Sequence, residues 1–149
     1  MVVRVGIIGA SGFTGAELLR LVAGHPDFEV VVATGDSQAG TRVADLYPSL
    51  AVPHRPGLAD DHRLDVVFCG LPHGTSQELV PDLLAPGRLV VDLGADFRLK
   101  DASLYPRWYH APHTVPELLA DAVYGLPELF RPELAALAPS GQRRMGANP

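Results

Sequence analysis

The sequence contains a single cysteine, so the chain cannot form an internal disulfide bond. No apolar stretch comes close to the roughly 18 residues that a transmembrane helix needs. The first residues lead straight into a strand pattern, without the charged and apolar regions of a secretory signal. We therefore expect no disulfide framework and no membrane span, and we expect a protein of the reducing cytoplasm.

Charge of one sign is not concentrated anywhere in the chain. It has 12 basic and 17 acidic residues, a net charge of −5, and both signs are spread along its length. This distribution argues against a nucleic-acid-binding arm or a disordered acidic tail. Repeats with a period of about 20 to 50 residues are also absent, which excludes solenoids and propellers. With 149 residues, 47% of them hydrophobic, the chain can bury one core, and small molecules are its expected partners.

The first 34 residues alternate between strand and helix patterns. Residues 2–8 form a β-branched apolar run that ends at Gly9, as is typical of a strand buried in a parallel sheet. Apolar residues then recur at helical spacing over residues 14–23, until Gly-His-Pro at 24–26 ends the helix. Residues 28–34 form a second buried strand. This order predicts a right-handed βαβ unit.

The alternation continues after a loop-rich stretch. Residues 35–63 are rich in proline and glycine, and we expect loop there with one short helix near residues 42–46. Strands are expected at 66–69 and 89–93, with an amphipathic helix at 75–84 between them. The sequence therefore predicts one Rossmann-like α/β domain over residues 1–149, built on a doubly wound parallel sheet.

The last third is rich in aromatic residues and proline. We expect loops from Gly94 to Arg131, interrupted by one short helix at 116–119, and such loops usually cover the carboxyl edge of the sheet. A further helix is expected at 132–137, and residues 144–148 have the pattern of a strand. Because this pattern stops abruptly, we expect a domain cut at its far edge and lacking a second domain. The aromatic loops after Gly94 should then be partly uncovered, and such an apolar patch promotes self-association.

The strongest local signal is the Gly-x-x-Gly-x-x-Gly segment at residues 9–15, between the first strand and the first helix. Glycines allow a tight turn and a close approach of the backbone to a pyrophosphate, which faces the positive end of the helix. The hydroxyls of Ser11 and Thr14 can add donors. A tight turn without a ligand is the less favoured alternative, since a complete βαβ frame surrounds the segment. The predicted dinucleotide-binding residues here are Gly9, Ala10, Ser11, Gly12, Phe13, Thr14 and Gly15.

The residues after the second strand bear on the choice of cofactor. Asp36 stands where a carboxylate often accepts a hydrogen bond from the ribose 2′-hydroxyl of NAD and repels a 2′-phosphate. The adjacent Ser37 and Gln38 are small donors that can hold that phosphate, and Asp36 can equally begin a turn that ends at Gly40. The residues alone leave NAD and NADP at even odds.

Leu-Pro-His-Gly at residues 71–74 follows an expected strand and precedes an expected helix. Ligands bind at this carboxyl edge of a parallel sheet, so Pro72, His73 and Gly74 are expected near the ribose and nicotinamide of the cofactor. The plain alternative is a helix-capping turn, since Gly74 and Thr75 suit a helix start on their own.

Other polar residues are weaker candidates. Cys69 ends an apolar strand, where a cysteine is most often a small buried hydrophobe. His110 and His113 have an Ala-Pro pair between them and no acidic or cysteine partners, so we expect no metal site. The remaining turn histidines, His25, His54 and His62, are expected in solvent.

Three charged residues lie on and after the expected strand at 89–93. Asp92, Asp96 and Arg98 occupy a good place for substrate contacts, and an ion pair that fixes the loop is equally expected.

Five motifs occur in a fixed order, at residues 9–21, 71–74, 91–99, 108–109 and 124–129. Together they resemble the N-acetyl-γ-glutamyl-phosphate reductase family of arginine biosynthesis, and the resemblance runs from end to end of the chain. Five ordered motifs are far more specific than one glycine loop. The Phe-Thr-Gly form of that loop is less similar to aspartate-semialdehyde dehydrogenase.

The resemblance implies an NADPH-dependent reduction of N-acetyl-glutamyl 5-phosphate to the 5-semialdehyde. In that family a cysteine attacks the acyl phosphate, and hydride reduces the resulting thioester. Carried over by position, residues 11–15 contact the cofactor phosphates, Ser37 the 2′-phosphate, and residues 72–74 the nicotinamide half. The resemblance thus favours NADP despite Asp36, and it implies a homo-oligomer, commonly a tetramer.

The chain departs from the family at its end. The family's nucleophile lies in a Gly-Cys-Tyr-Pro-Thr segment directly after Ala-Asn-Pro, and the sequence stops at Pro149 after Ala147 and Asn148. The substrate domain and the histidine that activates the thiol are also missing, and Cys69 matches an ordinary strand position. We therefore expect the cofactor-binding part of the enzyme, with no catalytic residue and no activity by itself.

Two alternatives remain open at this point. One is a non-catalytic dinucleotide-binding module, suggested by an intact glycine loop in a chain without a nucleophile. The other is the related reductase of a carrier-linked aminoadipyl phosphate in lysine biosynthesis, since the discriminating loops lie partly beyond Pro149.

Overall fold

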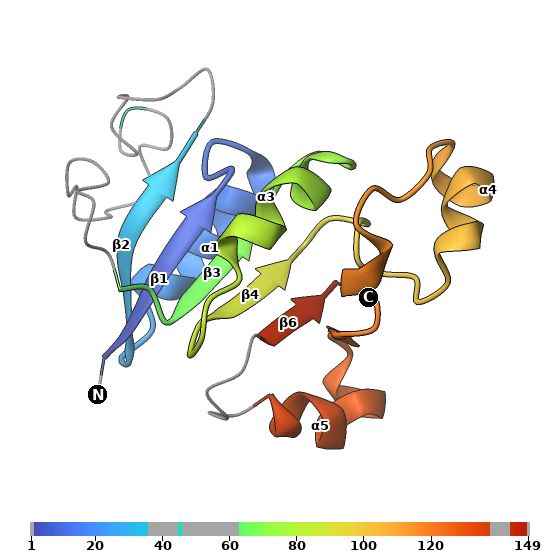
Figure 1. Ribbon diagram of the computed structural model, residues 1–149. Coiled ribbons are helices and arrows are strands. Elements are labelled where there is room, and N and C mark those ends of the chain that lie inside the picture. The colour runs from blue at the N-terminus through green and yellow to red at the C-terminus, as the bar shows by residue number, and fades with distance from the viewer. Residues whose placement is uncertain (1, 36–44, 46–62, 138–143, 149) are drawn as a thin grey trace. The chain divides into compact units, whose positions relative to one another are not determined.

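The computed structural model describes residues 2–35, 45, 63–137 and 144–148 (Figure 1). These residues belong to two compact units, residues 1–70 and 71–149. The short helix expected near residues 42–46 lies almost wholly outside the described residues. In the part of the chain that the structure describes, no helix has the length and apolar character that crossing a bilayer requires.

The first unit contains β1 (Val3–Ile8), α1 (Phe13–Ala23), β2 (Phe28–Thr34) and β3 (Val66–Cys69). All three strands are parallel, and β1 lies between β2 and β3. The register of β1 on β2 shifts by one residue between Val5 and Gly6. The predicted βαβ unit is confirmed, and the predicted strands at 28–34 and 66–69 have the observed bounds.

Hydrophobic burial explains this arrangement of the first unit. Val5 and Ile7 of β1 have no exposed surface, and they pack with Leu19 and Val22 from one face of α1. Burying each such side chain contributes about 1.5–3 kcal/mol. Cys69 at the end of β3 is also fully buried, so its prediction as a small core residue is confirmed.

The second unit has three parallel strands, with β6 between β4 and β5 (Figure 1). Its elements in chain order are α3 (Thr75–Leu83), β4 (Leu89–Asp92), η1 (Ala102–Leu104), α4 (Tyr105–Tyr109), η2 (Pro116–Leu118), β5 (Ala122–Tyr124), α5 (Pro127–Ala136) and β6 (Arg144–Ala147). The predicted helix at 75–84 and the strands at 89–93 and 144–148 are confirmed to within one residue at their ends.

The short helix expected at 116–119 is confirmed as η2, but the prediction of loop over the rest of residues 94–131 is wrong at three places besides η1. A short helix, α4, forms after Leu104 because Tyr105 is fully buried and its hydroxyl donates a hydrogen bond to the carbonyl oxygen of Asp96 at 2.7 Å. Burial also raises the pKa of Tyr105 to about 12, so the hydroxyl keeps its proton. One anchored side chain, rather than apolar periodicity, thus holds this five-residue helix.

The other two differences are β5 and the first half of α5. β5 has only three residues, too few to show a period, and it is held by pairing with β6. α5 begins at Pro127 and continues through a kink at Phe130, whereas the sequence predicts a helix only from 132. Proline suits the first turn of a helix, and the internal Pro132 is the reason that the prediction begins late.

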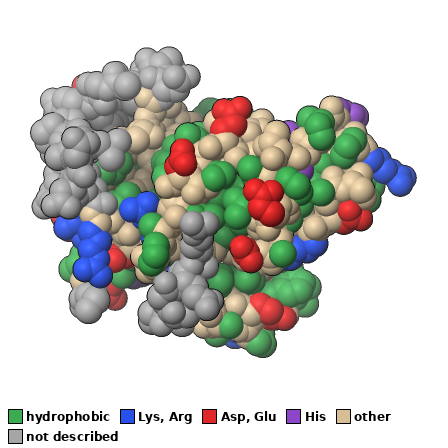
Figure 2. Space-filling model, viewed as in Figure 1, with side chains coloured by type: hydrophobic (Ala, Val, Ile, Leu, Met, Phe, Trp, Pro, Cys, Tyr) green, Lys and Arg blue, Asp and Glu red, His purple; other side chains and the backbone are tan. Residues whose placement is uncertain are grey.

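The loops after Gly94, which we expect to be partly uncovered, hold both buried and exposed large apolar side chains. Phe97 and Tyr105 are buried, whereas Trp108 and Leu129 are 61% and 69% exposed. Around α5, Figure 2 shows hydrophobic side chains next to acidic ones. Self-association of the chain stays a prediction.

Candidate cofactor-binding site

Residues 9–15, here called the glycine turn, join β1 to α1. Gly9 has a φ of 81°, a conformation that glycine adopts without steric cost. The backbone N–H groups of Gly9 and Ala10 donate to the carbonyl oxygen of Thr34 at 3.1 and 2.7 Å. The turn is therefore held against the end of β2.

Gly15 is required by packing. A Cβ atom at this position would lie 2.3 Å from the carbonyl oxygen of Gly9 and 2.5 Å from Cα of Ala10. Both are backbone atoms, so neither can move aside as the end of a side chain could. The third glycine of the motif thus allows α1 to pack against the turn.

Gly12 is different, because the fold does not require a glycine there. It is the residue before α1, with an ordinary extended conformation (φ −82°, ψ 169°), and a Cβ atom would approach only the carbonyl oxygen of Gly9, at 3.6 Å. The backbone conformation requires a glycine at position 9 and close packing requires one at position 15, but neither requires one at position 12. Close approach of a ligand to the backbone is a reason for glycine at this position.

The amino end of α1 has no side-chain cap. Gly12 offers no capping oxygen, and the first turn holds no acidic residue. Phe13 is 94% exposed, and Thr14 is exposed as well. The first N–H groups of a helix and the positive end of its dipole favour an anion. This end of α1 therefore suits a phosphate group.

The chain passes close to the glycine turn again just after β2. A Cβ atom at Gly35 would lie 3.1 Å from both Cβ and Oγ of Ser11. Asp36, Ser37 and Gln38 follow directly but lie outside the described residues. The predictions for Ser37, and for NAD against NADP, therefore stay predictions.

Residues 72–74, here called the histidine turn, precede α3. Gly74 is the residue before the helix and has no side chain to cap it, and the cap comes instead from Asp96. The Gly74 N–H donates to both carboxylate oxygens of Asp96, at 2.8 and 2.9 Å, and the Ser76 N–H donates to Oδ2 at 3.0 Å. Nε2 of the Gln77 side chain donates to Oδ1 at 3.1 Å. The sequence predicts that Gly74 and Thr75 could start the helix on their own, whereas the capping oxygens come from Asp96, 22 residues after Gly74.

The two helix starts therefore differ chemically. The amino end of α1 is without a carboxylate, whereas that of α3 holds the fully buried Asp96. The carboxylate would repel a second anion, and the N–H groups at the start of α3 already donate to Asp96. Of these two turns, only the glycine turn suits a phosphate.

Asp92 is a second buried carboxyl in the second unit, at the end of β4. Its Oδ1 accepts hydrogen bonds from the Ser76 hydroxyl at 2.7 Å and from the Gly94 N–H at 3.1 Å. Burial raises the pKa of Asp92, the hydrogen bond from Ser76 opposes this shift, and the charge of Asp96 adds to it.

The raised pKa leads to a prediction for Asp92→Asn. A carboxyl with a raised pKa binds its proton more tightly in the native state, so its contribution to the free energy of unfolding falls as pH rises. The stabilisation decreases between two pH values: the pKa of the unfolded state, near 3.8, and the higher pKa of the native state. Asparagine does not titrate, so the stability of the variant relative to the parent should increase with pH across that window. Urea unfolding at a series of pH values measures it, and a constant difference would contradict the raised pKa.

Arg98 does not pair with either carboxylate. Its Nε donates to the carbonyl oxygen of Asn148 at 3.1 Å, while the Asn148 side chain donates to the carbonyl oxygen of Leu93 at 3.1 Å. The loop-fixing ion pair expected among Asp92, Asp96 and Arg98 is therefore not formed, and Asp96 instead contacts Nδ1 of His73. Arg98 instead ties the segment after β6 to the loop after β4.

His113 is held by contacts within the second unit. Nε2 of His113 lies 2.7 Å from the carbonyl oxygen of Asp96, and Nδ1 accepts from the Val115 N–H at 3.2 Å. His110 ends α4 in the left-handed conformation, with φ 60°. Both ring nitrogens of His113 are thus engaged within the fold.

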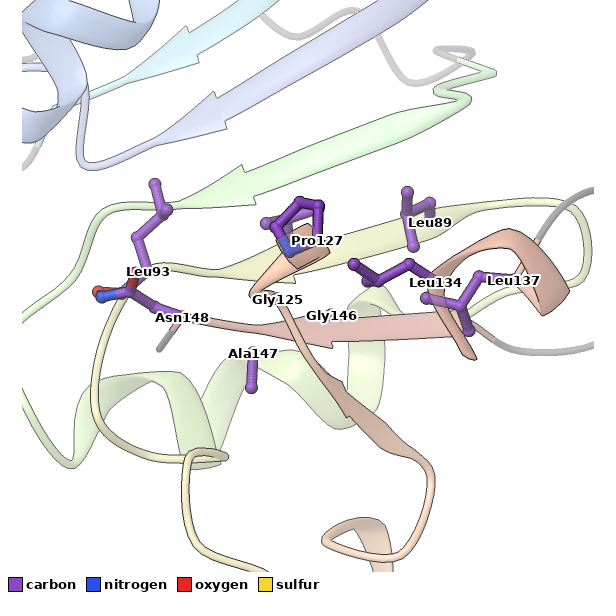
Figure 3. Close-up of a pocket in the computed structure, with 10 residues that line it drawn as sticks. Leu89, Leu93, Gly125, Pro127, Leu134, Leu137, Gly146, Ala147 and Asn148 are labelled. Atoms are coloured by element: carbon purple, nitrogen blue, oxygen red, sulfur yellow. The ribbon is translucent and has the colours of Figure 1, made fainter. Parts of the chain in front are cut away.

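A pocket of about 250 Å³ opens between α5 and the strands β4 and β6 (Figure 3). Its walls are almost entirely apolar, with Leu89, Val91, Leu134 and Leu137 on them and Asn148 at one end. The lining holds no charged side chain, and the amide of Asn148 already donates to the carbonyl oxygen of Leu93, so the pocket is poorly suited to a phosphate group. The pocket is therefore not part of the candidate dinucleotide site.

Comparison with known proteins identifies the family. A family model described as "Semialdehyde dehydrogenase, NAD binding domain" matches residues 4–137. The chain belongs to this family.

Curated relatives are named N-acetyl-gamma-glutamyl-phosphate reductase. One from Pseudomonas putida (strain W619) is 52% identical over 139 residues, which are 89% of this chain and 40% of the relative. One from Azotobacter vinelandii is 54% identical over 135 residues, 86% of this chain and 39% of the relative. The family resemblance seen in the five motifs is confirmed, and the chain spans about 40% of the length of these relatives.

Solved structures confirm the Rossmann-like α/β fold. Aspartate semialdehyde dehydrogenase from Candida albicans, solved with NADP, matches 99% of this chain and 42% of its own, with a TM-score of 0.59 and 16% identity. The Vibrio cholerae enzyme II matches 100% of this chain and 42% of its own, with a TM-score of 0.54 and 16% identity. At such low identity these matches bear on the fold alone.

Proposed function

We propose that this chain is the cofactor-binding part of an NADPH-dependent reductase of arginine biosynthesis. The whole protein converts N-acetyl-glutamyl 5-phosphate into N-acetyl-glutamate 5-semialdehyde, in the cytoplasm and as a homo-oligomer. The observation that carries this proposal is the 52–54% identity to reductases of that name across 86–89% of the chain. The nucleophile and the substrate domain then belong to the 60% of the relatives' length that the chain does not span.

The glycine turn is the proposed site of the cofactor diphosphate. The uncapped amino end of α1 supplies N–H donors, and Gly12 lets the ligand approach the backbone. Ser37 is proposed for the 2′-phosphate, and Pro72, His73 and Gly74 for the nicotinamide half. When bound, the cofactor supplies the hydride, while the residues of this chain hold and orient it.

The alternatives are less well supported. The curated relatives named above carry the arginine-pathway name and not that of the aminoadipyl-phosphate reductase. A non-catalytic module is suggested by the absence of a nucleophile from these residues, but the relatives that match most of the chain are named as reductases. The reductase is therefore the one function proposed.

Gly12→Ala tests the cofactor site without disturbing the fold. We expect the parent chain to bind NADPH, and we expect the variant to bind it about tenfold or more weakly, because a methyl group keeps the phosphate from the backbone. Thermal unfolding should be nearly unchanged, since the added Cβ meets only one atom at 3.6 Å. Isothermal titration with NADPH and NADH measures the affinities.

Gly24→Ala is the matched control for this substitution. Gly24 ends α1, has φ −88°, and a Cβ there would meet only carbonyl oxygens at 3.7 and 3.8 Å. It should bind NADPH like the parent. Equal loss in both variants, or a parent that binds neither dinucleotide, would refute the proposed site.

The reductase activity itself requires the longer protein. Sequencing the coding DNA beyond Pro149 should reveal Gly-Cys-Tyr-Pro-Thr in frame, and the encoded protein should oxidise NADPH in the presence of N-acetyl-glutamyl phosphate. A full-length protein without that activity would overturn the proposed function.

A further inference from the structure

His73 and Asp96 form an acid–imidazole pair at the amino end of α3. Nδ1 of His73 lies 2.6 Å from Oδ1 of Asp96. The Asp96 side chain has no exposed surface, whereas that of His73 is 32% exposed. The pair therefore has one end in the core of the second unit and the other at its surface.

The surroundings of Asp96 determine which nitrogen of His73 carries a proton. The N–H groups of Gly74, Ser76 and the Gln77 side chain all donate to its carboxylate oxygens. A carboxylate that receives donors on both oxygens acts only as an acceptor. The ring nitrogen that faces it at 2.6 Å must therefore be a donor, which puts the proton on Nδ1.

In the neutral form of the ring, the opposite nitrogen, Nε2, is then an acceptor. A neutral imidazole carries one proton, so protonation of Nδ1 leaves the lone pair of Nε2 available. Within the described ranges, the contacts of His73 are the one to Asp96 and a ring contact with Tyr109, at 4.6 Å between centroids. Nε2 has no hydrogen-bond partner among them, while the Tyr109 ring helps to fix the imidazole plane.

We propose that Asp96 is a positioning residue, which holds His73 in the Nδ1-protonated form so that Nε2 accepts a hydrogen bond from the bound dinucleotide. For the identity of the ligand, this inference rests on the proposed function; the position of the proton is a property of the chain alone. The uncharged half of a nicotinamide dinucleotide offers donors, namely the carboxamide N–H and ribose O–H groups. Phosphate oxygens offer only acceptors, and Asp96 repels them. The pair thus selects the uncharged half of the ligand.

Two substitutions separate the parts of this pair. In His73→Asn the side-chain amide takes the place of Nδ1 and still donates to Asp96, but the acceptor at Nε2 is lost. In Asp96→Asn the negative charge is lost and one of the two acceptor oxygens becomes an N–H donor, so the preference for a proton on Nδ1 of His73 is weakened. We expect each variant to bind NADPH about fivefold to tenfold more weakly. The double variant should lose no more NADPH affinity than the single variant that binds more weakly, because both substitutions act on the same hydrogen bond to Nε2 of His73.

His110→Asn is the matched control. It is the same substitution at an exposed histidine of the second unit, and asparagine tolerates the left-handed conformation found there. NADPH affinity should stay at the parent value. Thermal unfolding of every variant, recorded in parallel, identifies any loss of binding that comes from unfolding.

Long-range ¹H–¹⁵N NMR of the imidazole nitrogens tests the proton position directly, without a ligand. The parent should show a protonated Nδ1 and an unprotonated Nε2 for His73, and Asp96→Asn should lower the population of this form. A proton on Nε2 in the parent would overturn the inference. So would a parent that binds NADPH while His73→Asn binds it equally well. A parent that binds no dinucleotide contradicts the proposed function instead, and the NMR result still decides the role of Asp96.

Discussion

Replacing Gly15 with alanine should destabilise the chain by about 3 kcal/mol or more, which is at the upper end of what overpacking costs. The added Cβ would lie within 2.3–2.8 Å of three backbone atoms of Gly9 and Ala10. Those atoms belong to the glycine turn, which is itself hydrogen-bonded to the end of β2. Relief therefore requires α1 to move away from β1 and β2, which uncovers Leu19 and Val22.

Denaturant unfolding followed by circular dichroism measures this effect. Gly12→Ala and Gly24→Ala place the same methyl group at the two ends of α1, where its nearest contacts are 3.6 Å or more. Both should unfold close to the parent midpoint. A Gly15→Ala chain that unfolds at the parent midpoint would show that the turn is not packed as described.

Asp96→Ala should produce the second large loss of stability, about 3–5 kcal/mol, because a donor that loses its acceptor inside the fold costs about 1–3 kcal/mol and several donors share this carboxylate. The substitution leaves the N–H groups of Gly74 and Ser76 and the Gln77 amide without their acceptor. It also removes the partner of His73. Unlike Asp96→Asn, alanine offers no oxygen to any of these donors.

Glu17→Ala is a suitable comparison for this loss. Glu17 forms an ion pair with Arg20, three residues away, on an exposed face of α1. Exposed pairs contribute little to stability, so its unfolding midpoint should stay near that of the parent. Similar midpoints for the two variants would mean that Asp96 is not the cap of α3.

The parts of the fold that follow local rules were predictable from the sequence. The β-branched runs of β1, β2 and β3 predict buried strands, because the strands of a parallel sheet are covered on both faces and therefore have apolar side chains on both sides. The glycine turn was predictable because residues 9–15 fix both the turn and the start of α1. What the pattern does not distinguish is that Gly15 is required by packing and Gly12 is not. That difference depends on where the backbone of Gly9 and Ala10 lies in space.

The parts held by distant contacts were not predictable. Asp96 caps α3 across 22 residues of sequence, and α4 depends on the burial of Tyr105. β5 is held by pairing with β6. The signal that could have suggested a distant cap was Gly74 itself, because a helix that begins after a glycine needs its capping oxygen from elsewhere. Nothing local identifies Asp96 as its source.

The distant cap of α3 also bears on the order of events during folding. As the chain leaves the ribosome, residues 74 and 76 emerge well before Asp96. The N–H groups at the start of α3 therefore lack their carboxylate acceptor until the loop after β4 has been synthesised. The histidine turn and that loop should therefore become ordered in one cooperative step. In native-state hydrogen exchange, the amides of Gly74 and Ser76 should open together with those around Asp96, and not with the remaining turns of their own helix.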